Sequence, residues 1–173
     1  MKRPARGFTL IELMLGLTIL AILLALAVPS FRQFTRSNAA TSANNDLVTS
    51  LQLARSEALK RNRPVTVCAS ADGEECGESS DWNSGRIAIT DRGVPAVIDG
   101  EDAVLQRWVP QNTSLIFASE EDSAFVQFLP TGMAAAEATL DVSWEGCTGD
   151  RRRHITVLVT GTISSRLTQC EQD

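Results

Sequence analysis

Few side chains in this chain could carry out catalysis. The single histidine is His154, at the end of the run Arg151–His154. A catalytic serine or cysteine would therefore have only this one histidine to act as its base. We expect His154 to be a strand residue at a solvated sheet edge. The acidic clusters Asp99–Asp102 and Glu120–Asp122 lack the alternating ligands and the glycine of a calcium loop, so we expect solvated loops. The sequence therefore predicts no enzyme, no metal site and no cofactor.

Cysteine and tryptophan are the other candidates for a special role. The four cysteines form no C-x-x-C pair, and two disulfides in an oxidising compartment fit them better than zinc. Three connectivities are possible in principle. The cysteines are Cys68, Cys76, Cys147 and Cys170. The tryptophans are widely spaced and are expected to pack in or beside the core: Trp82, Trp108 and Trp144.

Glu12 is the ionisable group whose position is most informative. It lies inside the otherwise apolar run 8–29, which is long enough for a helix to cross a bilayer. A carboxylate costs a few kcal/mol there, so a partner is expected, such as an α-ammonium at Phe8 of the same or a neighbouring subunit. The alternative is that Glu12 lies near the membrane edge and snorkels to water.

The flanks of the apolar run predict its orientation. Three basic residues and no acid precede Gly7, so the N-terminus stays cytoplasmic and the chain from Phe31 onward is periplasmic in a Gram-negative cell. The rival interpretation is a secretory signal peptide cleaved after Ala25-Leu26-Ala27. A charge inside the apolar region and the length of that region argue against it.

A single long helix is predicted to carry this run into the rest of the chain. Pro29 should kink the helix, and Pro64 should end it. Residues 37–46 are small and polar, without an apolar face. An apolar stripe follows at helical spacing, formed by Leu47, Leu51, Ala54 and Ala58.

Short extended runs separated by turn residues follow Pro64. Strands after one long helix predict an α+β fold in which the helix packs on an antiparallel sheet. The expected parts are residues 1–7 as a leader, 8–29 as a transmembrane helix, 30–63 as its amphipathic second half and 64–173 as a β-rich periplasmic head. The candidate strands are Val65–Ser70, Arg86–Asp91, Val104–Val109, Ser114–Phe117, Ala124–Leu129, Thr139–Trp144, His154–Thr160 and Thr162–Leu167.

The segment Gly7-Phe8-Thr9-Leu10-Ile11-Glu12 resembles the processing site of type IV prepilins and type II secretion pseudopilins. The resemblance implies cleavage between Gly7 and Phe8 by a prepilin peptidase, followed by N-methylation of Phe8. It also implies that Glu12 is the family's signature acid, used in assembly, and that Pro29 is the family's helix kink.

Further segments resemble the FimT, FimU and GspH group of minor pilins and pseudopilins. This resemblance implies a structural subunit that initiates or caps a pilus or pseudopilus from the inner membrane. Its expected partners are other minor pilins or pseudopilins, the major pilin and the assembly platform, and the C-terminal cysteine pair favours the pilus form. Arg86 departs from the group, which commonly has an aromatic residue there. The segments are Ser50–Ala58, Arg61-Asn62, Val65–Cys68, Asp81–Gly85 and Phe128–Gly132.

Two predicted hairpins give a hypothesis for the disulfides. Cys68–Cys76 would close a loop at the tip of the first hairpin. Cys147–Cys170 would staple the last one, with a turn at Gly161 that sets Arg153 opposite Gln169.

A basic patch raises DNA uptake as an alternative function. Some FimT-like proteins bind DNA through a C-terminal Gly-Arg-x-Arg stretch, but the matching place here reads Gly161-Thr162-Ile163-Ser164-Ser165-Arg166. Loss of the leader leaves 13 basic and 21 acidic residues, a net charge of −8, which disfavours nucleic acid. The candidate patch is Arg151, Arg152, Arg153 and Arg166, with Lys60 and Arg61 as possible additions.

Overall fold

A computed structural model describes residues 9–77, 80, 82–100, 102–109, 114–119 and 124–170, apart from the side chains of residues 26 and 29. The leader, Gly7 and Phe8 lie outside the described residues. One helix, α1, spans Leu10–Arg61 and confirms the predicted long helix. The chain divides into two compact units, Met1–Thr35 and Arg36–Asp173, so α1 contributes to both.

In the second unit, α1 buries a stripe of small and apolar side chains. The predicted stripe is confirmed, since Leu47, Leu51, Ala54 and Ala58 are fully buried. It begins earlier than predicted, because Ala40 and Ala43 are also fully buried. The expectation that residues 37–46 have no apolar face is therefore wrong. Alanine makes a weak hydropathy signal, but its small side chain lets a sheet approach the helix closely.

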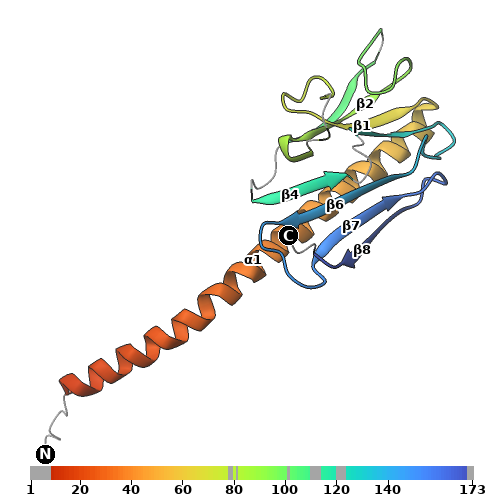
Figure 1. The fold of residues 1–173 in the computed structure, drawn as a ribbon. Helices are drawn as coiled ribbons and strands as arrows, with labels where there is room; N and C mark the ends of the chain where they lie inside the picture. The colour runs from red at the N-terminus through yellow and green to blue at the C-terminus, as the bar shows by residue number, and fades with distance from the viewer. Residues whose placement is uncertain are drawn as a thin grey trace, which may run out of the picture. The chain divides into compact units, whose positions relative to one another are not determined.

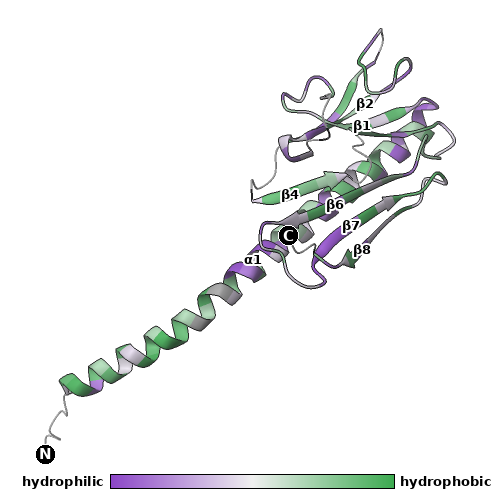
Figure 2. Ribbon diagram, in the orientation of Figure 1, coloured by the Kyte–Doolittle hydropathy of each residue, from purple (hydrophilic) through white to green (hydrophobic). Residues whose placement is uncertain are grey.

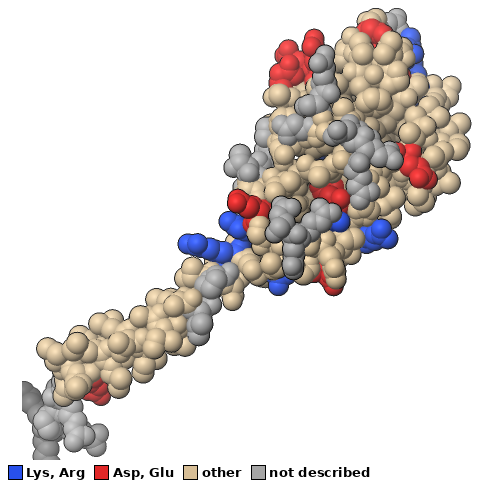
Figure 3. Space-filling model, viewed as in Figure 1, with Lys and Arg blue, Asp and Glu red and all other residues tan. Residues whose placement is uncertain are grey.

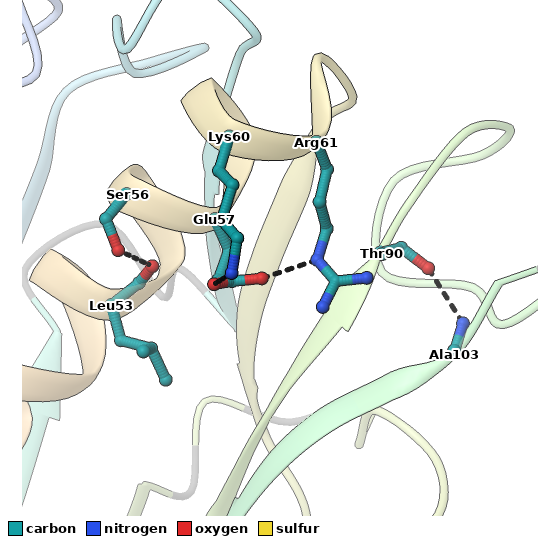
Figure 4. A network of polar contacts seen from close by, with 7 residues as sticks. All are labelled: Leu53, Ser56, Glu57, Lys60, Arg61, Thr90 and Ala103. Atoms are coloured by element: carbon teal, nitrogen blue, oxygen red, sulfur yellow. Dashed lines mark hydrogen bonds and ion pairs between the residues drawn. The ribbon is translucent and has the colours of Figure 1, made fainter.

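The end of α1 is fixed by its backbone and by ion pairs. Asn62 has a φ of 52°, and the Arg63 N–H donates to the Ala58 carbonyl at 3.3 Å, which is a Schellman-type cap. Glu57 accepts hydrogen bonds from Arg61 and Lys60, as Figure 4 shows. These bonds, chiefly the one from Arg61, hold the pKa of Glu57 below its usual value.

Among the described residues, eight strands form two antiparallel sheets that pack with this part of the helix (Figure 1). The first sheet has the order β3-β2-β1-β5 and the second has the order β4-β6-β7-β8. The first sheet consists of β3 Val104–Trp108, β2 Arg86–Thr90, β1 Val65–Ala69 and β5 Phe125–Phe128. The second consists of β4 Leu115–Ser119, β6 Ala138–Trp144, β7 Arg152–Val157 and β8 Ile163–Thr168.

The core lies between the helix stripe and the inner faces of both sheets. Val67 of β1, Phe128 of β5 and Leu140 of β6 belong to the same buried cluster as the helix alanines. The first sheet also buries a smaller cluster on its outer face, around Cys68, Ile87 and Ile89. Both faces of β1 and β2 are therefore buried, which explains their continuous apolar sequences.

The predicted strands are confirmed in number and order, but one register is wrong. The first hairpin pairs Val65 with Thr90, as expected for β1 and β2. In the last hairpin, Arg153 lies opposite Leu167 and not opposite Gln169. The turn therefore centres one residue earlier than Gly161, because Leu158 and Thr162 close it through a backbone hydrogen bond of 3.0 Å.

Two disulfides join the cysteines in the pairs proposed from the hairpins. Cys68 of β1 is bonded to Cys76, eight residues further along the chain. Cys147, after β6, is bonded to Cys170, after β8, with a separation of 23 residues. The Cys170 N–H also donates to the Gly149 carbonyl at 2.9 Å, so the end of the chain returns to the β6–β7 connection.

Candidate assembly helix and head surfaces

The described chain begins with a helix cap made by Thr9 and Glu12. A Glu12 Oε2 oxygen lies 3.4 Å from both the backbone nitrogen and the hydroxyl of Thr9, and the Glu12 N–H donates to that hydroxyl at 3.4 Å. This reciprocal arrangement is a capping box, with Thr9 at the N-cap and Glu12 at N3. The Thr-x-x-Glu spacing could have been recognised in the sequence. The carboxylate therefore faces the start of its own helix.

Beyond this cap, α1 presents large apolar side chains to the surface of the first unit. Leu10, Ile11, Met14 and Ile22 are each more than half exposed, and Figure 2 shows the hydrophobic colouring along this part of the helix. An 18-residue stretch of this part is strongly apolar, and none of it is buried. By length and composition the helix can cross a membrane.

Within this span, the hydroxyl of Thr18 finds its partners inside the helix. The Thr18 hydroxyl donates to the Met14 and Leu15 carbonyls at 2.8 and 2.9 Å. The helix continues through position 29. A kink at Pro29 stays a prediction.

The arginines of the candidate DNA patch separate onto different surfaces. Arg153 faces α1, where its Nη2 donates to the Thr41 hydroxyl at 2.8 Å. Arg152 faces the opposite side of the sheet and donates to Thr168 at 3.2 Å. Arg166 of β8 is exposed on that same side. Lys60 and Arg61 are engaged with Glu57 at the end of α1.

His154 does not lie at a solvated edge, so that expectation is wrong. Its strand, β7, runs between β6 and β8, and the residue is only 7% exposed. The His154 Nδ1 lies 2.9 Å from Oδ1 of Asp141, itself buried, and Arg152 Nε lies 3.7 Å from the same oxygen. Sequence reasoning missed Asp141, because only the sheet register brings it opposite His154.

The three tryptophans pack in the head, and Trp108 also contacts Arg86. Trp82 and Trp144 are buried, while Trp108 lies half-buried with the Arg86 guanidinium over its ring at 5.4 Å. Arg86 Nε donates to the Ser50 hydroxyl on α1 at 3.1 Å. Burial lowers the pKa of Arg86 to about 10, although the negative charge of Asp46 opposes this shift. Its Nη2 has no hydrogen-bond partner among the described residues.

The acidic clusters make local contacts. The Asp102 carboxylate accepts the N–H groups of Arg92 and Asp99, at 3.2 and 3.4 Å. Glu120–Asp122 lies outside the described residues. Within the described ranges, no three His, Cys, Asp or Glu side chains are grouped as metal ligands would be.

Residues 43–161 match the sequence family described as type II transport protein GspH, which covers more than half of the chain. The chain belongs to this GspH family. Residues 2–28 also match the prokaryotic N-terminal methylation motif. Together with the apolar helix, this motif indicates a membrane-anchored, pilin-like protein.

Curated relatives of this GspH-family chain are fimbrial proteins. It is 26% identical over 129 residues to the type IV major fimbrial protein FimA of Dichelobacter nodosus, covering 73% of this chain and 68% of that protein. It is 30% identical over 115 residues to FimA of strain VCS1703A, covering 65% of this chain and 63% of that protein. The chain thus spans about two thirds of the length of these relatives.

Solved structures share the fold. The type IV minor pilin FimU of Pseudomonas aeruginosa superposes with a TM-score of 0.60 at 23% identity, covering 76% of this chain and 90% of that chain. The minor pseudopilin EpsH of the Vibrio cholerae type 2 secretion system gives 0.51 at 16% identity, covering 75% of this chain and 96% of that chain. The predicted pilin-like fold is confirmed.

Two segments that are distant in the sequence meet at one place in the head. Arg55, from the helix segment Ser50–Ala58, donates from Nε to the Gly132 carbonyl at 2.9 Å. Gly132 ends the segment Phe128–Gly132, and Gly161 lies against the same carbonyl. These contacts join the helix to the segment after β5 and to the β7–β8 turn, which is a structural role.

Proposed function

We propose that this chain is a minor pilin or pseudopilin that initiates or caps a type IV pilus or a type II secretion pseudopilus, as a structural and non-enzymatic subunit. The observation that carries the proposal is that the two parts of α1 differ in their exposure. Its first part displays large exposed apolar side chains, while its second part is the buried centre of a folded head. An apolar helix end needs a lipid or helical environment, and a filament of similar subunits supplies the second.

The maturation pathway follows from the methylation motif. A prepilin peptidase cuts between Gly7 and Phe8 and the new Phe8 nitrogen is methylated, which leaves it positively charged. Residues 8–29 hold the protein in the inner membrane, with a cytoplasmic N-terminus and a periplasmic head. The assembly platform then brings the helix against those of other minor pilins and the major pilin, at or near the filament tip.

Glu12 is the residue proposed to guide this assembly. The capping geometry holds its carboxylate beside Thr9, the residue that follows Phe8 in the sequence. In an apolar environment two opposite charges attract strongly. A neighbour's ammonium can then replace the Thr9 contacts, which at 3.4 Å are long.

Three variants separate this charge from the helix cap. Glu12→Gln keeps a side-chain acceptor for the Thr9 N–H but removes the charge, and Glu12→Ala removes both. Thr9→Ala removes the capping hydroxyl and keeps the charge. We expect both Glu12 variants to insert normally yet enter filaments poorly, and Thr9→Ala to assemble almost as well as the wild type. Wild-type incorporation of Glu12→Gln would show that the charge is not an assembly contact.

Deletion of the gene tests the proposal at the level of the system. Loss of surface pili, or of secretion of type II substrates, should follow and be restored by the wild-type gene. A map of the neighbouring genes separates the two systems, because each travels with different partner genes. Normal piliation and normal secretion in the deletion strain would contradict the proposal.

A further inference from the structure

The outer face of the first sheet carries a groove whose described lining includes no residue of α1 and no arginine. It has a volume of about 520 Å³ and opens beside the first residues of β5. This volume is within the range of protein ligand sites. Apart from Glu75, its walls are apolar or backbone: Glu75, Cys76, Gly77, Ala96, Val97, Ile98, Ala124 and Phe125.

One wall of the groove is a loop fastened by covalent and polar contacts. The Cys68–Cys76 disulfide ties residues 70–77 to β1, and the Gly77 N–H donates to the Ala69 carbonyl at 2.7 Å. Arg107 of β3 holds the same loop through the Gly73 carbonyl at 2.6 Å. The Asp72 carboxylate accepts hydrogen bonds from the N–H groups of Glu74 and Glu75. These bonds, chiefly the one from Glu74, lower the pKa of Asp72.

The opposite wall belongs to the connection between β2 and β3, which is also held in place. The buried Asp91 carboxylate accepts the Ala96 N–H at 2.8 Å and the Thr66 hydroxyl at 2.6 Å. Ile98 packs on the small cluster of the outer face. Both walls are therefore preformed, so a bound segment would lose little affinity to the ordering of the protein.

The groove keeps apolar side chains accessible under an acidic rim. Val97 is 47% exposed and Phe125 is 37% exposed. Asp72, Glu74 and Glu75 are exposed on the first loop, where Arg107 makes its contact with Gly73. Asp99 and one base, Arg92, are exposed on the second loop. Figure 3 shows acidic side chains near the top of the view, at the loop end of this sheet.

From this apolar floor and acidic rim, we infer that the groove binds a short extended segment of another protein in which a large apolar side chain is flanked by lysine or arginine. The apolar side chain enters between Val97 and Phe125, and the basic residues lie along the acidic loops. The charge complementarity steers association and selects against acidic segments. This inference does not depend on which filament the protein enters, since no residue of the groove belongs to α1.

The direct test is peptide binding to the full chain in detergent micelles. The probes are labelled acetylated pentapeptide amides: Ala-Lys-Phe-Lys-Ala, a version with glutamate for lysine and a version with serine for phenylalanine. We expect the first peptide to bind at least about tenfold more tightly than the other two, and its affinity to fall as salt is raised. Equal binding of the glutamate version, or no binding of the lysine version at millimolar concentration, would overturn the inference.

A matched pair of variants locates the site. Val97→Lys places a charge in the groove, whereas Val94→Lys places the same charge on a residue of the same loop that is 62% exposed and outside the lining. We expect Val97→Lys to weaken the peptide at least about tenfold and Val94→Lys by less than about threefold, with unchanged thermal unfolding of both. Equal weakening by both variants would contradict the assignment. So would a concentration-dependent dimer that Val97→Lys disrupts, because the groove would then hold a second copy of this chain.

Discussion

Arg55 of α1 donates a hydrogen bond to the carbonyl oxygen of Gly132, 77 residues further along the chain. Gly161 approaches the same oxygen so closely that an added methyl group would overlap it. Gly161 also has a φ of 79°, which side chains with a Cβ rarely adopt. One carbonyl thus ties the helix, the end of β5 and the β7–β8 turn together.

Substitution of Gly161 by alanine should therefore destabilise the head strongly. We expect Gly161→Ala to cost about 3 kcal/mol or more, from backbone strain and the clash together. Gly146→Ala is the matched control, because Gly146 has a φ of 74° but its methyl group would meet no atom of the described residues within 4 Å. That variant should lose only about 1 kcal/mol. Thermal unfolding of both proteins measures the difference, and equal losses would mean that the clash is relieved at no cost.

The buried Arg86 should contribute little net stability. Its charge is desolvated and one of its nitrogens has no partner among the described residues, so Arg86→Met should change the free energy of unfolding by less than about 1.5 kcal/mol. Arg86→Ala should cost about 2–4 kcal/mol, because it also leaves a cavity beneath Trp108. Denaturant unfolding compares the two variants. A loss of about 3 kcal/mol or more in Arg86→Met would show that the charge itself holds the sheet to α1.

The sequence predicted the helix, the strands along the chain and the pilin-like class, because these rest on strong local signals, but it did not predict the order of the strands in two separate sheets. A long apolar run, two prolines and regularly spaced turn residues each act within a short stretch of chain. The Gly7–Glu12 motif added a resemblance that the family match supports. Contacts between individual side chains, apart from the two disulfides, could not be predicted in the same way.

The misses have different physical causes, and one of them is dependence on pairing between distant residues. His154 was expected at an edge, but its burial depends on β8 adding to β7 and on Asp141 across the sheet. The observed register of the last hairpin differs from the predicted one because the turn closes at Leu158 and Thr162. Ala40 and Ala43 were missed because alanine carries too little hydropathy to mark a buried face.

Both disulfides should be present in the mature protein and should be structural. Non-reducing peptide mapping is expected to find Cys68 joined to Cys76, and Cys147 joined to Cys170. Replacement of either pair by serine should cost about 2–4 kcal/mol of stability. A peptide that joins Cys68 to Cys147 would contradict the topology, because Cys68 lies in the first sheet and Cys147 follows β6 of the second.

Duplex DNA should bind weakly or not at all. Arg153 donates to Thr41 on α1, while Arg152 lies on the opposite face beside Asp141, so the two cannot address one DNA backbone. Two or three phosphate contacts release few counterions, so any binding at low salt should vanish by about 150 mM. A gel shift with the full chain in detergent tests this. Micromolar binding that survives that salt and is lost when Arg151, Arg152 and Arg153 are all changed to alanine would instead support an uptake receptor.

The central claim is that this protein is made as a prepilin and matured for assembly into a filament. Intact-mass and N-terminal peptide mass spectrometry of the protein from membranes and sheared filaments tests it most directly. We predict a mature chain that begins at Phe8 with one added methyl group on its α-nitrogen, and the uncut precursor in a strain without the prepilin peptidase. A mature chain that begins at Val28 would show signal-peptide cleavage and would contradict the account.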